Sequence, residues 1–129
     1  MLSLLRRSPR ARREHALRPH AARLYARSDR RAPAGELVWI HAVSVGETRA
    51  AAPLVERILR ERPSATVLLT SMTATGRETG RALFGERVVQ AWLPYDLPGA
   101  MRRFLAHFRP AFGLLMETEL WPNLLAAAE

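Results

Sequence analysis

Residues 37–63 read LVWIHAVSVGETRAAAPLVERILRERP. The first part, Leu37 to Val43, is a short and mostly apolar run, which is typical of a strand buried on both faces. Residues 48–62 repeat apolar side chains at helical spacing, with Pro53 expected in the first turns and Pro63 beyond the end. The apolar positions that share one helical face are Leu54, Val55, Ile58 and Leu59. The stretch therefore predicts a strand, a loop and an amphipathic helix.

The same order recurs along the rest of the chain. Further mostly apolar runs of strand length, also typical of strands buried on both faces, are Thr66 to Thr70, Val88 to Leu93 and Phe112 to Met116. Helical patterns occupy 76–84 and 99–108, and another begins near Trp121. In the second of these, Met101, Phe104, Leu105 and Phe108 stand at i, i+3, i+4 and i+7. Alternating strands and helices of this kind predict an α/β fold, a parallel Rossmann-like sheet with flanking helices.

The net charge of +8 is confined to the start of the chain. Residues 1–31 hold ten of the 20 basic residues, all Arg, against Glu14 and Asp29, and the remaining 98 residues balance ten arginines with ten acids. A folded part without net charge does not favour a cationic groove for nucleic acid. We therefore expect no nucleic-acid partner.

The chain divides at residue 34. Residues 1–34 carry arginine pairs interrupted by prolines and are expected to be a basic, poorly packed segment, followed by one folded domain over 35–129. Met1 to Leu5 is apolar and precedes the arginines, which is the reverse of a secretory signal. No uninterrupted apolar run approaches the roughly 18 residues of a membrane-spanning helix. The absence of cysteine excludes disulfides and zinc thiolate sites and fits a reducing compartment.

Four loops follow the predicted strands, where ligands bind in open α/β sheets. They read Ser44-Val45-Gly46-Glu47, Ser71-Met72-Thr73-Ala74-Thr75-Gly76, Pro94-Tyr95-Asp96 and Glu117-Thr118-Glu119. Three carry carboxylates, and two combine glycine with hydroxyl residues at expected helix N-termini, where backbone N–H groups attract anions. Neither glycine-containing loop has the spacing of a dinucleotide fingerprint or a P-loop.

Several residues allow both a structural and a chemical interpretation. Glu47 would either cap the helix that follows it or act as a general base at the mouth of the sheet. Glu117 and Glu119 would either join Glu47 in an acidic cluster or be solvated loop acids. His41 is expected to be a hydrogen-bonded core residue, and no second histidine stands at metal-ligand spacing from it. Trp121-Pro122-Asn123 would either supply a functional aromatic side chain or simply start a helix, since proline is common in the first helical turn.

Together the loops resemble one family. WIHAVSVGE at 39–47, TSMTATG at 70–76, LPYDLP at 93–98 and METELWPN at 116–123 are similar to the N-terminal domain of 3-deoxy-D-manno-octulosonic acid (Kdo) transferases. The resemblance covers about residues 37–126 and implies the incomplete N-terminal, acceptor-side half of a two-domain GT-B glycosyltransferase. The C-terminal nucleotide-binding domain would then be absent from this chain. Two departures are Ala74, where the family usually has proline, and an apolar start limited to Met1 to Leu5.

The resemblance implies inverting, metal-independent transfer of Kdo from CMP-Kdo to a lipid A precursor, lipid IVA, in lipopolysaccharide biosynthesis. Glu47 would be the proton acceptor and Glu117 the transition-state stabiliser, without cofactor or metal. Substrate-binding positions would be Ser44, Gly46, Thr73, Thr75, Gly76 and Glu119. The Gly46 and Gly76 turns would face the phosphorylated glucosamine of the acceptor or the carboxylate of the donor.

The family acts at the cytoplasmic face of the bacterial inner membrane, which implies a peripheral location with the arginine-rich segment on anionic lipid. Because a donor domain would be missing, we expect the isolated chain to be inactive. The alternative is a non-enzymatic module that binds anionic lipid or a partner protein.

Overall fold

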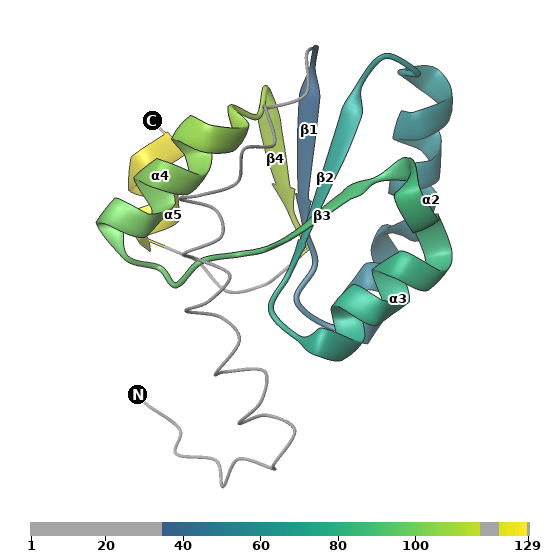
Figure 1. Ribbon diagram of the computed structural model, residues 1–129, viewed down its shortest axis with the longest axis horizontal. Helices are drawn as coiled ribbons and strands as arrows, with labels where there is room; N and C mark the ends of the chain where they lie inside the picture. Colours follow the sequence, from purple (N-terminus) through teal and green to yellow (C-terminus); the bar gives the residue numbers. More distant parts are fainter. Residues whose placement is uncertain (1–34, 117–121, 129) are drawn as a thin grey trace, which may run out of the picture.

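A computed structural model describes residues 35–116 and 122–128. Over these ranges the strands form one parallel sheet in the order β3-β2-β1-β4 (Figure 1). The strands are β1 (Leu37–His41), β2 (Thr66–Ser71), β3 (Val89–Trp92) and β4 (Phe112–Leu115). The predicted α/β fold with a parallel Rossmann-like sheet is confirmed.

Helices cover both faces of the sheet. They are α2 (Val45–Glu61), α3 (Ala74–Phe84), α4 (Pro98–Phe108) and α5 (Pro122–Ala128), with a short 3₁₀ helix η1 (Gly85–Arg87) after α3. Figure 1 shows α2 and α3 on one face and α4 and α5 on the other. None of the helices in the described ranges is long and apolar enough to cross a membrane.

The central strand β1 divides the core into two layers. Leu37 and Trp39 belong to the cluster under α4 and α5, whereas Val38 and Ile40 belong to the cluster under α2 and α3. Successive strand residues point to opposite faces, so a continuous apolar run supplies both layers. Fully burying one such side chain is worth about 1.5–3 kcal/mol. All five residues of β1 are buried, as its sequence predicts.

Helix α2 differs from its expected limits. It begins at Val45 rather than Thr48, because Ser44 caps it, and β1 ends at His41 rather than Val43. Pro53 therefore lies inside the helix and not in its first turns, so the expectation for this proline is wrong. Pro63 does follow the helix end, and the ends of the other elements lie within two residues of their expected positions.

An ion pair ties α2 to the end of α3. Arg87 donates to both carboxylate oxygens of Glu56, at 2.8 and 2.7 Å, and also to the carbonyl of Leu83 at 3.1 Å. Hydrogen bonding from Arg87 lowers the pKa of Glu56 from its ordinary value, and the same bond raises the pKa of Arg87. Both groups are exposed, so solvent screens the pair.

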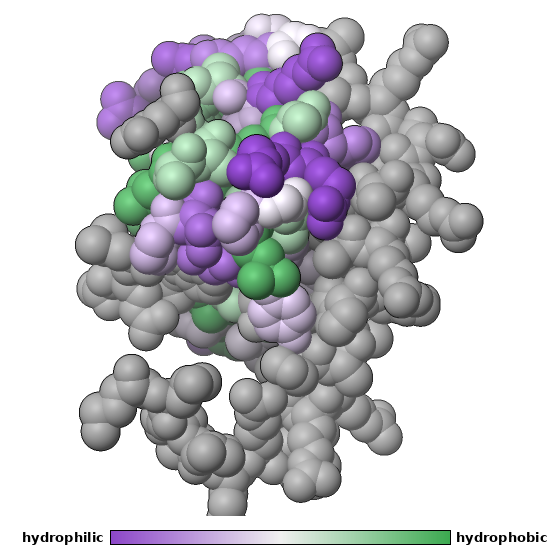
Figure 2. Space-filling model, turned by 90° about the vertical axis from the view of Figure 1, so that its left-hand side faces the viewer, coloured by the Kyte–Doolittle hydropathy of each residue, from purple (hydrophilic) through white to green (hydrophobic). Residues whose placement is uncertain are grey.

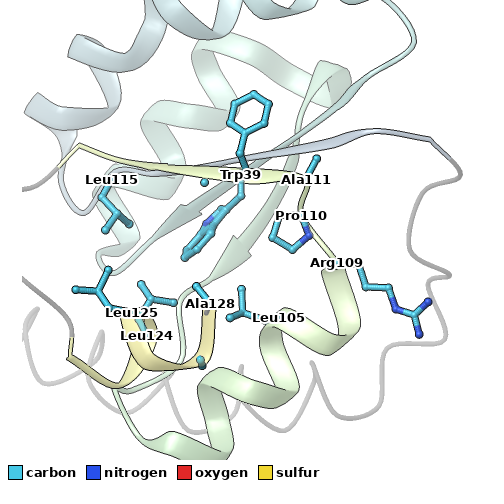
Figure 3. Close-up of a pocket in the computed structure, with 12 residues that line it drawn as sticks. Trp39, Leu105, Arg109, Pro110, Ala111, Leu115, Leu124, Leu125 and Ala128 are labelled. Atoms are coloured by element: carbon cyan, nitrogen blue, oxygen red, sulfur yellow. The ribbon is translucent and has the colours of Figure 1, made fainter.

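Strand β4 is less covered than its sequence suggests. Phe112 is 39% exposed, and a hollow of about 310 Å³ runs between β4, α4 and α5. Figure 3 shows Trp39, Leu105, Leu115 and Leu124 around this hollow. The expectation that β4 is buried on both faces is therefore wrong for the described residues.

Figure 2 shows the molecule from the side on which α4 lies. Hydrophilic and hydrophobic residues are mixed over the coloured part of this surface.

Gly113 makes room for the largest side chain of β1. A Cβ on Gly113 would lie 2.6 Å from Cε3 of Trp39. The indole cannot easily move, because its Nε1 donates to Thr70 Oγ1 at 2.8 Å and its ring lies 5.2 Å from that of Phe104. A methyl group at residue 113 would therefore force the indole or β4 to shift, and overpacking of this kind costs about 1–3 kcal/mol.

We predict that Gly113→Ala lowers the free energy of unfolding by about 1–3 kcal/mol, measured by urea unfolding followed by circular dichroism. Gly46→Ala is the control, because its added Cβ would meet only Ser44 Oγ, at 3.9 Å. Equal stabilities for the two variants would show that the Trp39 ring is not held in place.

Candidate active site

The carboxyl ends of the parallel strands meet at one edge of the sheet. The chain passes from β1 to β2 and β3 on one side and then crosses to β4 on the other side of β1. Ligands of open α/β sheets bind where the strand order reverses in this way, outside the carboxyl ends. The loops that leave β1 and β4 therefore flank the expected binding crevice.

Glu47 stands in the first turn of α2 and completes a capping box with Ser44. Its Oε2 accepts from the backbone N–H groups of Val43 at 2.5 Å and Ser44 at 3.2 Å. Ser44 Oγ in turn accepts from the Glu47 amide at 3.5 Å. The capping interpretation is confirmed, and both of these carboxylate bonds use Oε2. The capping role therefore leaves Oε1 available for the chemical role, and the two interpretations are compatible.

The loop after β2 is joined to the loop after β1. Thr73 caps α3 by accepting from the Gly76 amide at 3.0 Å, and its hydroxyl donates to the Val43 carbonyl at 3.0 Å. Gly76 is buried, and a Cβ there would lie 3.1 Å from Val43 O and 3.2 Å from Ser44 C. The N-termini of α2 and α3 consequently lie side by side at the sheet edge.

The structure places the predicted substrate-binding residues of these two loops together. They are Ser44, Gly46, Thr73, Thr75 and Gly76. Gly46 is exposed, whereas the hydroxyls of Ser44 and Thr73 and the amide of Gly76 already serve helix caps. Glu117 and Glu119 lie outside the described residues, as do Trp121 and the basic segment 1–34.

His41 is a buried core residue, as expected. Its Nδ1 lies 2.9 Å from Thr70 Oγ1, the same hydroxyl that accepts from Trp39. Within residues 35–116 and 122–128, no group of three or more His, Asp or Glu side chains is placed to hold a metal ion.

Sequence reasoning missed the role of Asp96. Its carboxylate accepts from the backbone amides of Leu124 at 2.9 Å and Asn123 at 3.3 Å, and Asn123 Nδ2 donates back to the Asp96 carbonyl at 2.8 Å. Asp96 therefore caps α5 from the loop after β3. The sequence shows only that α5 needs a cap from elsewhere, because the residue before Pro122 is Trp121, which has no side-chain oxygen.

Comparison with known proteins gives the family. The family model described as "3-Deoxy-D-manno-octulosonic-acid transferase (kdotransferase)" matches residues 12–129. The chain belongs to the Kdo transferase family.

Curated relatives support the same assignment. This Kdo transferase family member is 58% identical over 111 residues to the 3-deoxy-D-manno-octulosonic acid transferase of Bordetella pertussis, covering 81% of this chain and 26% of the relative. It is 43% identical over 93 residues to the protein of the same name from Haemophilus influenzae, covering 72% of this chain and 22% of the relative.

An Arabidopsis thaliana protein named as a probable mitochondrial 3-deoxy-D-manno-octulosonic acid transferase is 40% identical over 96 residues, covering 74% of this chain and 22% of that protein. The chain thus spans about a quarter of the length of the curated relatives it matches. No solved structure gave a significant match.

We predict that Asp96→Ala in this Kdo transferase chain lowers the free energy of unfolding by about 1 kcal/mol, the usual cost of losing a helix cap. It should also speed hydrogen exchange at the Leu124 amide, because that amide loses its acceptor. Glu78→Ala, which removes an exposed carboxylate from α3, is the control. Unchanged exchange at Leu124 in Asp96→Ala would contradict the capping role.

Proposed function

We propose that this chain is the acceptor-side, N-terminal part of an enzyme that transfers Kdo from CMP-Kdo to lipid IVA, the lipid A precursor, in lipopolysaccharide biosynthesis. Membership of the Kdo transferase family supports the reaction. The proposed mechanism is based on the position of Glu47 at the carboxyl edge of the sheet. Among the described residues, the hydrogen bonds to its carboxylate all use Oε2.

Glu47 is the general base of this proposal. A sugar hydroxyl is a weak nucleophile near neutral pH, so its proton must be removed as it attacks. Glu47 takes that proton on Oε1, the acceptor oxygen bonds to the anomeric carbon of Kdo, and the bond from that carbon to the phosphate of CMP breaks. The electron pair leaves with CMP. Displacement in a single step inverts the anomeric centre and requires neither metal nor cofactor.

The remaining site residues bind and stabilise charge. Glu117 is the proposed transition-state stabiliser, and Glu119 contacts substrate. Ser44, Gly46, Thr75 and Gly76 lie at two adjacent helix N-termini, whose dipoles favour anions such as a glucosamine phosphate or the donor carboxylate. A ligand at the Gly76 amide would compete with Thr73 for that donor.

The whole enzyme is proposed to be a GT-B glycosyltransferase, with CMP-Kdo held between this domain and a nucleotide-binding domain. The enzyme would act at the cytoplasmic face of the bacterial inner membrane as a peripheral protein.

We predict that Glu47→Gln, in a full-length transferase carrying this chain, slows Kdo transfer by about 10² to 10⁴. Glutamine also completes a capping box, so thermal stability should change little. The assay follows radiolabelled Kdo passing from CMP-Kdo to lipid IVA. Glu117→Gln should also slow transfer, and Glu78→Gln should not. Wild-type turnover by the purified Glu47→Gln enzyme would reject the base assignment.

The arginines of residues 1–31 are proposed to attach the protein to anionic lipid, at about 1 kcal/mol per arginine near the headgroups. We predict that this chain sediments with vesicles of phosphatidylglycerol and phosphatidylethanolamine, and that binding falls as salt rises because exposed charges are screened. Removal of residues 1–31 should abolish the salt-sensitive binding. Binding that survives both changes would indicate apolar attachment instead.

A further inference from the structure

The hydroxyl of Thr73 takes part in two hydrogen bonds, one as donor and one as acceptor. It donates its single proton to the Val43 carbonyl at 3.0 Å and accepts from the Gly76 amide at 3.0 Å. A phosphate or carboxylate oxygen of a substrate would need that same proton as its donor. Thr73 is therefore poorly suited to bind an anionic substrate directly.

The carbonyl that Thr73 holds belongs to the peptide group that anchors Glu47. The Val43 C=O and the Ser44 N–H are parts of one planar unit, so fixing the oxygen also fixes the direction of the N–H. That N–H donates to Glu47 Oε2 at 3.2 Å. A continuous path of hydrogen bonds thus runs from Thr73 through one peptide group to the carboxylate, and a bond to the carbonyl strengthens the N–H as a donor.

Gly76 allows the first turn of α3 to approach the same peptide group closely. A Cβ at this position would lie 2.9 Å from Thr73 Oγ1 and 3.1 Å from Val43 O. The first turn of α3 therefore packs directly against the backbone that holds Glu47.

We propose that Thr73 is a positioning residue for Glu47, acting through the Val43–Ser44 peptide. This inference rests on the proposed function and replaces substrate binding as the role of Thr73. The loop after β2 then sets the orientation of the carboxylate that belongs to the loop after β1.

Thr73→Val tests this proposal in a full-length transferase carrying this chain, because valine keeps the shape and loses the hydroxyl. Misplacing a reacting group by about 1 Å can cost 10²-fold, so we expect kcat to fall about ten- to a hundredfold while KM for lipid IVA stays unchanged. Thr73→Ser, which retains the hydroxyl, should restore most of the rate. Thr79→Val is the matched control, because the Thr79 hydroxyl bonds only its own helix, at Thr75 O, among the described residues (2.8 Å).

A double-mutant comparison separates positioning from other roles. If Thr73 acts through Glu47, adding Thr73→Val to Glu47→Gln should slow the residual transfer no further. A further loss of the same factor in the Glu47→Gln background, or a raised KM for lipid IVA with kcat unchanged, would overturn the proposal.

A measurement on the 129-residue chain itself does not depend on the reaction. In NMR spectra, Thr73→Val should speed hydrogen exchange of the Ser44 amide and shift the Glu47 carboxylate carbon, whereas Thr79→Val should do neither. An unchanged Ser44 amide would overturn the positioning role whatever the enzyme does. Absence of Kdo transfer by the wild-type full-length protein would instead reject the proposed function, so the two failures are distinguishable.

Discussion

The structure depends on burying both faces of β1. Its side chains supply both core layers, and its backbone is paired with β2 on one side and β4 on the other. A strand in this position has no solvent-facing side, so helices must cover both faces of the sheet. The chain must therefore cross from one face to the other to place helices on each. That crossing places the strand order reversal, and with it the candidate site, beside the end of β1.

Helix starts at the sheet edge serve stability and site geometry together. Ser44 caps α2, Thr73 caps α3, and Asp96 caps α5 from the loop after β3. Thr73 also bonds the loop after β1 through the Val43 carbonyl. Buried backbone N–H groups need partners, so the groups that satisfy them also fix the loops around the crevice. A cap lost at this edge would therefore disturb the geometry of the candidate site as well as folding.

Sequence periodicity was sufficient to predict the strands and the amphipathic helices, because both depend on local spacing. The alternation of strands with helices was sufficient to predict that the strands are parallel. The place of Glu47 after a strand predicted either a helix cap or a general base, and the structure confirms the cap. The cap that Asp96 provides to α5 and the bond from Thr73 to Val43 depend on loops that only the folded sheet brings together. The interior position of Pro53 was missed because the capping box starts α2 before the apolar pattern begins. Exposure of β4 was also missed, since an apolar run does not tell which strand lies at an edge.

The double role of Glu47 explains why a carboxylate suits this position. A serine or threonine would offer one oxygen, and a hydroxyl that accepts from a backbone amide is no base. Glutamate has two oxygens, of which Oε2 receives the Val43 and Ser44 amides. Anchoring one oxygen restricts rotation of the group, so the other oxygen is held in a fixed direction without a further side chain. Capping thus gives Oε1 the fixed direction that the proposed proton transfer requires, so the structural and chemical interpretations of this residue are compatible with one arrangement.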